Sequence, residues 1–186
     1  MGDKFPILGG LACDNWKFHQ SYQFFQTEVL SDSVPILLFS GKLLFSYGVA
    51  NGWVPIGRKA VVTSSEQNIL YEIDNQPALD FYDDYFAGLT PSPEYPLAIL
   101  DPQANEFYTR APYNCDRNNK CIYYLAQIPE QAVVQIAQAS REDILAAAKT
   151  SITKALKTYP GTQPKAALFF SCLARHQLLG TRTKEE

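Results

Sequence analysis

Cys172, Arg175 and His176 form the one group in the sequence that could supply a nucleophile and its base. A cation near a cysteine lowers the pKa of the thiol and favours the thiolate, which is the reactive form. A histidine close to a nucleophile is the usual base that activates it. Because a free cysteine is more often a small buried core residue, three interpretations of Cys172 stay open: core residue, ligand contact or catalytic nucleophile.

Other catalytic and metal-binding patterns are missing. The chain has two histidines and neither a G-x-S-x-G turn nor a phosphate-binding loop ending in Gly-Lys-Ser/Thr. Cys115 and Cys121 are separated by five intervening residues (C-x5-C), whereas zinc sites use C-x2-C spacing. A disulfide between them is geometrically possible. We therefore expect no catalysis, no metal and no cofactor. The alternative is a cysteine-dependent hydrolase that uses Cys172 and His176.

Two further residues are candidates for binding. Asp14 follows a glycine-rich turn that begins at Gly9 and Gly10. Its side chain could cap that turn, since aspartates bond nearby backbone N–H groups, or hold a ligand ammonium or hydroxyl. Trp53 lies between Gly52 and Pro55, which permit and fix a tight backbone path. It is either a core residue or the wall of a pocket.

Composition excludes several classes of protein. Of the 186 residues 46% are apolar and 19% charged, which excludes a disordered chain. The net charge is −3 with no basic stripe, so nucleic-acid binding is not expected. The apolar runs are far shorter than the ~20 residues that cross a membrane. Leu11-Ala12-Cys13 only superficially resembles a lipoprotein signal, and we expect a cytoplasmic protein with reduced cysteines.

In the first part of the chain the sequence predicts several strands followed by one helix. The helix is predicted over Gln76–Ala87, where apolar residues recur at three- and four-residue spacing, with Asp74 or Asn75 as its cap. The predicted strands are Phe5–Ala12, His19–Thr27, Val34–Ser40, Leu43–Ala50, Lys59–Ser64 and Asn68–Ile73.

The second part repeats this order. A second helix is predicted over Arg141–Thr158, begun by a capping box of Ser140 and Asp143, and a helix start follows Cys172. The fold class is therefore α+β, with mixed, mostly antiparallel sheet and at least two helices packed on it. The predicted strands are Leu97–Leu100, Phe107–Ala111, Ile122–Gln127, Ala132–Ala137 and the buried Lys165–Cys172.

Three ordered motifs resemble the FIST family. Gly9 to Asp14 resembles the GG-x-A-x-D turn late in the N-terminal FIST domain. Gly48 to Gly57, with the segments up to Tyr82, looks like the junction between the N- and C-terminal FIST domains. Ala167 to Arg175 is similar to the family's LLFSCxxR strand. The resemblance implies that 1–88 is the end of a FIST N-terminal region and 89–186 the start of a FIST C-terminal region.

The resemblance also implies a function. FIST domains are sensory domains of signal transduction proteins, proposed to bind small ligands such as amino acids. Their partners are output modules such as diguanylate cyclases, kinases or chemoreceptors. We expect the ligand concavity where the glycine turn, Trp53 and the end of the last strand converge. Its residues would be Gly10, Asp14, Trp53, Cys172 and Arg175.

Two expectations about assembly follow. The family pattern makes the chain look like the middle piece of a longer domain, so apolar strands such as Val34–Ser40 would lack neighbours and a homodimer is expected. A plain protein-interaction module is the other alternative, since Tyr22, Phe24 and Phe25 are expected on an exposed strand.

Overall fold

The computed structural model describes residues 6–101 and 106–186. These residues divide into two compact units, each described by itself below. Unit 1 is Met1–Ala50 with Lys149–Lys184, and unit 2 is Asn51–Ala148 with Glu185–Glu186. The boundary predicted between residues 88 and 89 stays a prediction.

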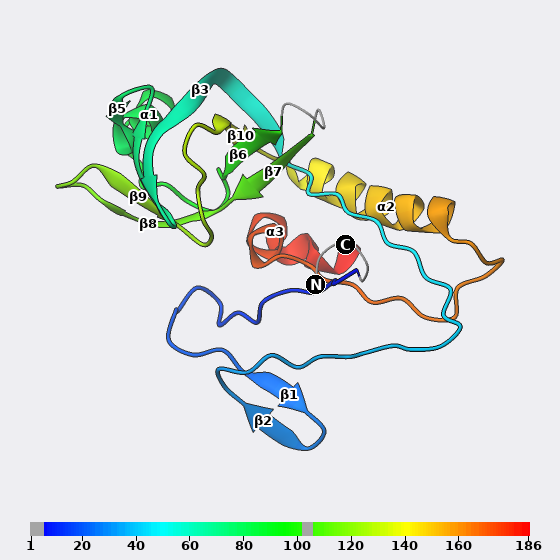
Figure 1. Cartoon of the computed structure of the whole chain (residues 1–186). Coiled ribbons are helices and arrows are strands. Elements are labelled where there is room, and N and C mark those ends of the chain that lie inside the picture. Colours follow the sequence, from blue (N-terminus) through cyan, green and yellow to red (C-terminus); the bar gives the residue numbers. More distant parts are fainter. Residues whose placement is uncertain (1–5, 102–105) are drawn as a thin grey trace. The chain divides into compact units, whose positions relative to one another are not determined.

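Unit 2 is built on an eight-stranded sheet (Figure 1) in which every ladder between described strands is antiparallel. The strand order is β7-β6-β10-β3-β4-β9-β8, with β5 paired to β4. The strands are β3 (Val54–Glu66), β4 (Ile69–Ile73), β5 (Gln76–Pro77), β6 (Leu97–Asp101), β7 (Glu106–Arg110), β8 (Pro112–Asp116), β9 (Cys121–Tyr124) and β10 (Val133–Gln138).

The sheet of unit 2 curls back on itself. Strands β7 and β8 lie at opposite ends of the strand order, yet Ala111 alone separates them in sequence. One residue spans no more than about 3.6 Å, so the outer strands must come together. The 13-residue strand β3 makes this possible: its first part pairs with β10, and its last part, from Val62, pairs with β4. Figure 1 shows β3 strongly bent.

Helix α1 (Ala78–Phe86) provides the other side of the core of unit 2. Ala78, Leu79, Phe81 and Tyr82 are buried on one helix face, as the spacing of the apolar residues predicts. The predicted cap is wrong, because Asp74 and Asn75 both have positive φ (51° and 60°) and form the tight turn between β4 and β5. The core residues from the sheet are Ala60, Val62, Leu70, Ile73, Leu97, Ile99, Ile122, Tyr124, Val134 and Ile136.

Unit 1 contains much less regular structure. Its described elements are the hairpin β1 (Gln23–Phe25) and β2 (Glu28–Leu30), helix α3 (Leu173–Leu179) and most of the 3-10 helix η1 (Gly180–Glu185). Helix α2 (Arg141–Thr158) has its predicted bounds and continues from unit 2 into unit 1 at Lys149. At its start Ser140 and Asp143 form the predicted capping box: the Asp143 N–H donates to the Ser140 hydroxyl across 3.1 Å, and the Ser140 N–H donates to the Asp143 carboxylate across 2.8 Å.

Several predicted strands of unit 1 are wrong. Residues 6–12, 34–40, 43–50 and 165–172 are all described and none of them forms a strand, while Phe5 lies outside the described residues. The β-structure predicted over His19–Thr27 is confined to Gln23–Phe25. A strand is stable only when its backbone groups pair with a neighbour, and these segments have no hydrogen-bonded ladder in the described structure. The α+β class with mostly antiparallel sheet and at least two helices is nevertheless confirmed.

The cysteine pair of unit 2 lies in the β8–β9 hairpin. Cys115 is opposite Ile122, and Cys121 is opposite Asp116, so the two thiols do not face each other across the ladder. Both are free cysteines in the structure. Within the described chain, no group of three or more His, Cys, Asp or Glu side chains is arranged to hold a metal ion.

Candidate functional site

Asp14 organises the loop that follows the glycine turn in unit 1. Its carboxylate accepts backbone N–H hydrogen bonds from Phe18 (3.1 Å), His19 (2.7 Å) and Gln20 (3.3 Å). Hydrogen bonds to the charged form of a carboxyl group favour that form. The bond from His19 is therefore the main cause that lowers the pKa of Asp14.

The loop held by Asp14 has an unusual backbone. Asn15, Trp16 and Phe18 all have positive φ, at 59°, 65° and 54°. For bulky residues this left-handed region costs on the order of 1 kcal/mol or more each, so the surrounding hydrogen bonds must maintain the loop shape. Backbone strain of this kind is often found at ligand-binding and active sites.

A hollow of about 390 Å³ opens beside this loop. Its lining combines a carboxylate, an ammonium group, an imidazole, an amide, a thiol and a phenol. Groups of both charges next to each other suit a small polar molecule that carries both an acid and an amine. The lining residues are Cys13, Asp14, Lys17, His19, Gln20 and Tyr22.

Gly10 lies beside the segment that precedes Cys172. A Cβ atom added at Gly10 would be 3.8 Å from the Phe170 ring and 4.0 Å from its Cβ, which is ordinary van der Waals contact. The structure therefore brings together, within unit 1, the glycine turn and the residues just before Cys172. Sequence analysis expected both segments at the ligand site.

Cys172 and Arg175 lie at the start of α3. Cys172 is exposed and immediately precedes the helix, so the prediction that it ends a buried strand is wrong, because the segment has no strand neighbour. Arg175 is 9% exposed, and its Nη1 donates to the carbonyl of Ala50 across 3.1 Å. Arg175 thus ties α3 to the end of the N-terminal segment within unit 1.

The hydrolase alternative requires a hydrogen bond between the Cys172 thiol and the His176 imidazole. Cys172 and His176 are linked through their backbones, with the N–H of His176 donating to the Cys172 carbonyl across 3.2 Å. Among the described side chains the structure has no hydrogen bond between the Cys172 thiol and the His176 imidazole. The geometry lacks the base contact that an activated thiol needs.

Trp53 belongs to unit 2 and is 6% exposed. Its Nε1–H donates to the carbonyl of Glu94 across 3.0 Å, and the Oδ1 of Asn51 accepts its backbone N–H. A buried indole whose N–H is satisfied by backbone is typical of a structural core residue. Because Trp53 and Cys172 lie in different units, their predicted convergence stays a prediction.

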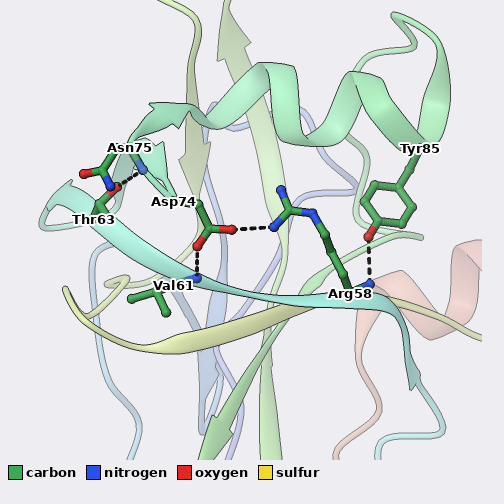
Figure 2. A network of polar contacts seen from close by, with 6 residues as sticks. All are labelled: Arg58, Val61, Thr63, Asp74, Asn75 and Tyr85. Atoms are coloured by element: carbon green, nitrogen blue, oxygen red, sulfur yellow. Dashed lines mark hydrogen bonds and ion pairs between the residues drawn. The ribbon is translucent and has the colours of Figure 1, made fainter.

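A polar network of unit 2 was missed by sequence analysis. Figure 2 shows it around Asp74, whose carboxylate accepts the backbone N–H of Val61 (2.8 Å) and a hydrogen bond from Arg58. The bond from Val61, followed by that from Arg58, lowers the pKa of Asp74. The same network places the Arg58 guanidinium 5.0 Å over the Phe81 ring of α1.

Two further contacts complete this network (Figure 2). The Tyr85 hydroxyl accepts the backbone N–H of Arg58 across 3.0 Å, and the Thr63 hydroxyl accepts that of Asn75 across 2.9 Å. Together they attach α1 and the tight turn before it to strand β3. The Arg58 and Asp74 side chains are 54% and 35% exposed, so the network fixes this surface of the unit rather than lining a cavity.

Comparison with known proteins identifies the family. Residues 1–76 match the model of the FIST N domain, and residues 78–186 match that of the FIST C domain. The chain belongs to the FIST family. This confirms the resemblance inferred from the motifs, and FIST domains are sensory domains of signal transduction proteins.

One relative of this FIST chain is a protein of Methanocaldococcus jannaschii described only as uncharacterized. It is 29% identical over 172 residues, which cover 88% of the chain and 33% of the relative. The chain therefore spans about a third of that relative's length. No solved structure matches.

None of the helices in residues 6–101 and 106–186 has both the length and the apolar character that a membrane span needs.

Proposed function

We propose that this FIST chain binds a small polar metabolite, such as an amino acid, at the loop organised by Asp14, and that it has no catalysis of its own. The observation that carries the proposal is the hollow beside that loop, where Lys17 and Asp14 offer opposite charges within one lining. A ligand carboxylate would meet Lys17 and a ligand amine would meet Asp14. Opposite charges with satisfied hydrogen bonds are the usual recognition of a zwitterion.

The other predicted site residues take supporting roles in this proposal. Gly10 lies beside Phe170, and Arg175 holds α3 to the segment that ends at Ala50. Cys172 would be a ligand contact. The role of Trp53, a buried residue of unit 2, in ligand binding stays a prediction.

A thermal-shift and calorimetric screen of the amino acids and related metabolites tests the proposal. A ligand at a hundred times its Kd adds ~2.7 kcal/mol to the stability of the folded state, which raises the melting temperature measurably. We expect Lys17→Gln and Asp14→Asn to weaken binding. Lys42→Gln, which changes an exposed lysine outside the hollow, is the matched control.

The proposal fails if no metabolite shifts the melting temperature, or if Lys17→Gln binds as tightly as the parent. The hydrolase alternative has its own test. Turnover of simple ester or amide substrates that Cys172→Ala abolishes would make the chain an enzyme and overturn the non-catalytic part of the proposal.

One observation favours a second function, protein interaction. The β1–β2 hairpin presents Phe24 opposite Val29, with 74% and 61% of these residues exposed. An isolated two-stranded hairpin is marginally stable, so pairing with another strand would stabilise it. Pull-down of the parent chain against Phe24→Ser tests whether the hairpin itself recruits a protein.

The cellular setting is also part of the proposal. We place the domain in the cytoplasm, as the sensory part of a longer protein whose output module is a diguanylate cyclase, a kinase or a chemoreceptor. No nucleic acid and no membrane takes part in the proposed function.

A further inference from the structure

The second half of helix α2 carries a cluster of like charge. Residues 149–158 contain Lys149, Lys154 and Lys157, all exposed, and no acidic residue. The chain as a whole is acidic, with a net charge of −3. This segment is therefore a local basic surface on a protein whose average charge has the opposite sign.

These lysines have no carboxylate partner in the described parts of the chain. The ion pairs of Arg58 with Asp74 and of Lys120 with Asp80 involve other residues. The helix macrodipole favours a cation only in the last turn, which accounts for Lys157 but not for Lys149. Lys154 and Lys157 are three residues apart and repel each other, so an approaching anion would be attracted to both.

The same face of the helix also exposes apolar side chains. Ile152 and Leu156 are 38% and 54% exposed, and residues four apart lie one above the other on a helix. At 100° per residue, Lys149 and Thr153 come next to this pair around the helix. The exposed face thus combines an apolar strip with a basic flank.

Contacts on the opposite side of α2 fix this orientation within unit 1. A Cβ at Gly48 would come within 2.0 Å of the Ser151 carbonyl oxygen, so the N-terminal segment passes directly against the helix. The Ser46 hydroxyl donates to the Ala155 carbonyl across 2.6 Å. Lys154, at the border between this packed side and the lysine-bearing side of α2, donates to the Val49 carbonyl across 3.2 Å. The helix cannot turn its apolar strip inward without breaking these contacts.

The basic flank is a shallow, open surface formed by one side of α2. Its lining side chains are ammonium groups and hydroxyls, with no carboxylate among them. Such a lining is complementary to acidic groups. It is formed by Lys149, Thr150, Thr153, Lys154 and Lys157.

We propose that the exposed face of α2, centred on Leu156 and Lys149, docks an acidic protein segment in which carboxylates flank an apolar side chain. Charge complementarity selects the carboxylates, and the Ile152–Leu156 strip selects the apolar residue between them. A nucleic acid would use the lysines and leave the apolar strip uncovered. A membrane would require a broad apolar face on the helix, and here the remaining sides of α2 carry lysines or pack against the N-terminal segment.

This surface goes beyond ligand sensing, since it would be where the sensory domain contacts its output partner. It does not depend on the proposed ligand site. A chain that binds no metabolite could still dock the segment, and a chain that fails to dock could still bind a metabolite.

Fluorescence anisotropy with the whole chain tests the proposal. The probe is a labelled synthetic peptide with glutamates flanking leucines at helical spacing, compared with a peptide in which the leucines are replaced by serines. We expect the leucine peptide to bind more tightly. The charge reversal Lys149→Glu/Lys154→Glu/Lys157→Glu should weaken binding by roughly tenfold, from three exposed charge pairs. Leu156→Gln should weaken it several-fold.

Matched controls are available in the same chain. Lys42→Glu/Lys59→Glu/Lys165→Glu reverses three exposed lysines elsewhere, and Leu44→Gln changes a leucine that is 58% exposed. Both should bind like the parent, and circular dichroism should show every variant folded. All these positions are exposed, so folding is expected to survive.

Three results would overturn the proposal. The first is equal binding by the triple α2 reversal and the parent. The second is tighter binding to polyuridylate or to phosphatidylglycerol vesicles than to the peptide, with Leu156→Gln unaffected, which would assign the lysines to a polyanion. The third is equal binding of the leucine and serine peptides.

Discussion

The hydroxyl of Tyr124 on β9 donates to the hydroxyl of Tyr82 on α1 across 3.1 Å, inside the core of unit 2. Tyr82 in turn donates to the carbonyl of Tyr95 across 3.4 Å. Both tyrosines are fully buried. This chain of hydrogen bonds links a strand, the helix and the connection that follows the helix, and a buried hydroxyl that loses its partner is costly.

The two tyrosines should differ in their contribution to stability. Tyr124→Phe removes one donor and leaves Tyr82 bonded to Tyr95, so we expect a loss of about 0.5–1.5 kcal/mol in the free energy of unfolding. Tyr82→Phe leaves the Tyr124 hydroxyl and the Tyr95 carbonyl without that partner, and the expected loss is about 1–3 kcal/mol. Urea unfolding followed by fluorescence measures both. A larger loss for Tyr124→Phe would contradict the assigned direction of the hydrogen bonds.

The same pair predicts sensitivity to alkaline pH. Burial raises the pKa of Tyr82 and of Tyr124 above the ordinary value of 10.0. The folded state therefore retains protons that the unfolded chain has lost, and this stabilisation is present below pH 10.0 and declines as the pH rises beyond it. Urea midpoints between pH 8 and about pH 11 should fall, and Tyr124→Phe should reduce the slope. Tyr22→Phe, at an exposed position, should leave the slope unchanged.

Gly57 should tolerate no side chain. Its φ is +70°, and a Cβ there would lie 2.2 Å from the Tyr85 hydroxyl oxygen. We expect Gly57→Ala to lower the free energy of unfolding by about 2 kcal/mol or more, from backbone strain and displacement of Tyr85. Gly88→Ala separates these effects, because Gly88 has φ of +84° with open space around it. Thermal unfolding that is equal for both variants would show that the Tyr85 contact contributes nothing.

Asp74 should account for part of the acid sensitivity of unit 2. Its pKa is lowered first by the Val61 N–H and then by Arg58, so its contribution is present above pH 3.8 and is lost as the pH falls below that value. Asp74→Asn should lower the free energy of unfolding at pH 7 by about 1 kcal/mol, a modest figure because the pair is partly exposed. The variant should also lose less stability than the parent between pH 6 and about pH 3. Asp80→Asn, which breaks the exposed pair with Lys120, is the control with a smaller expected effect.

Local signals predicted the parts of the fold that local interactions determine. The capping box of Ser140 and Asp143 located the start of α2, because both partners lie within one helical turn. Strands β3, β4, β6, β7, β9 and β10 of unit 2 were predicted from apolar patterns and turn residues, whereas β5 and β8 were not predicted. Val34–Ser40 was predicted as a buried strand from its continuous apolar run, but a run of apolar residues does not specify the neighbour with which it must pair.

In the candidate site, too, local contacts could be predicted from the sequence and contacts between distant residues could not. Asp14 was identifiable because an aspartate after a glycine turn bonds nearby N–H groups, and its three acceptor contacts are all local. Arg58 and Asp74 are 16 residues apart, and each alone resembles an ordinary surface charge. Two sequence signals could have pointed to this network: Gly57, next to Arg58, and the Asp74-Asn75 turn. Glycine, asparagine and aspartate are the residues that most readily adopt the positive φ found there.

The apolar segments of unit 1 predict self-association. Phe39, Phe45, Phe169 and Phe170 are 57%, 47%, 70% and 59% exposed, which amounts to roughly 400–500 Å² for side chains of 150–250 Å² each. Ile36, Leu37, Leu38 and Leu168 are also mostly exposed, and extensive exposed apolar surface favours association. Their backbone forms no ladder in the described structure, so pairing with a strand of a second copy would satisfy its hydrogen-bonding groups.

Light scattering across a hundredfold dilution should show a dimer that dissociates, and Leu168→Lys should favour the monomer. Leu89→Lys changes a leucine of equal exposure in unit 2, at 68% against 67%, and should not alter the dimer. A strict monomer at every concentration would show that these segments need no second copy of the chain.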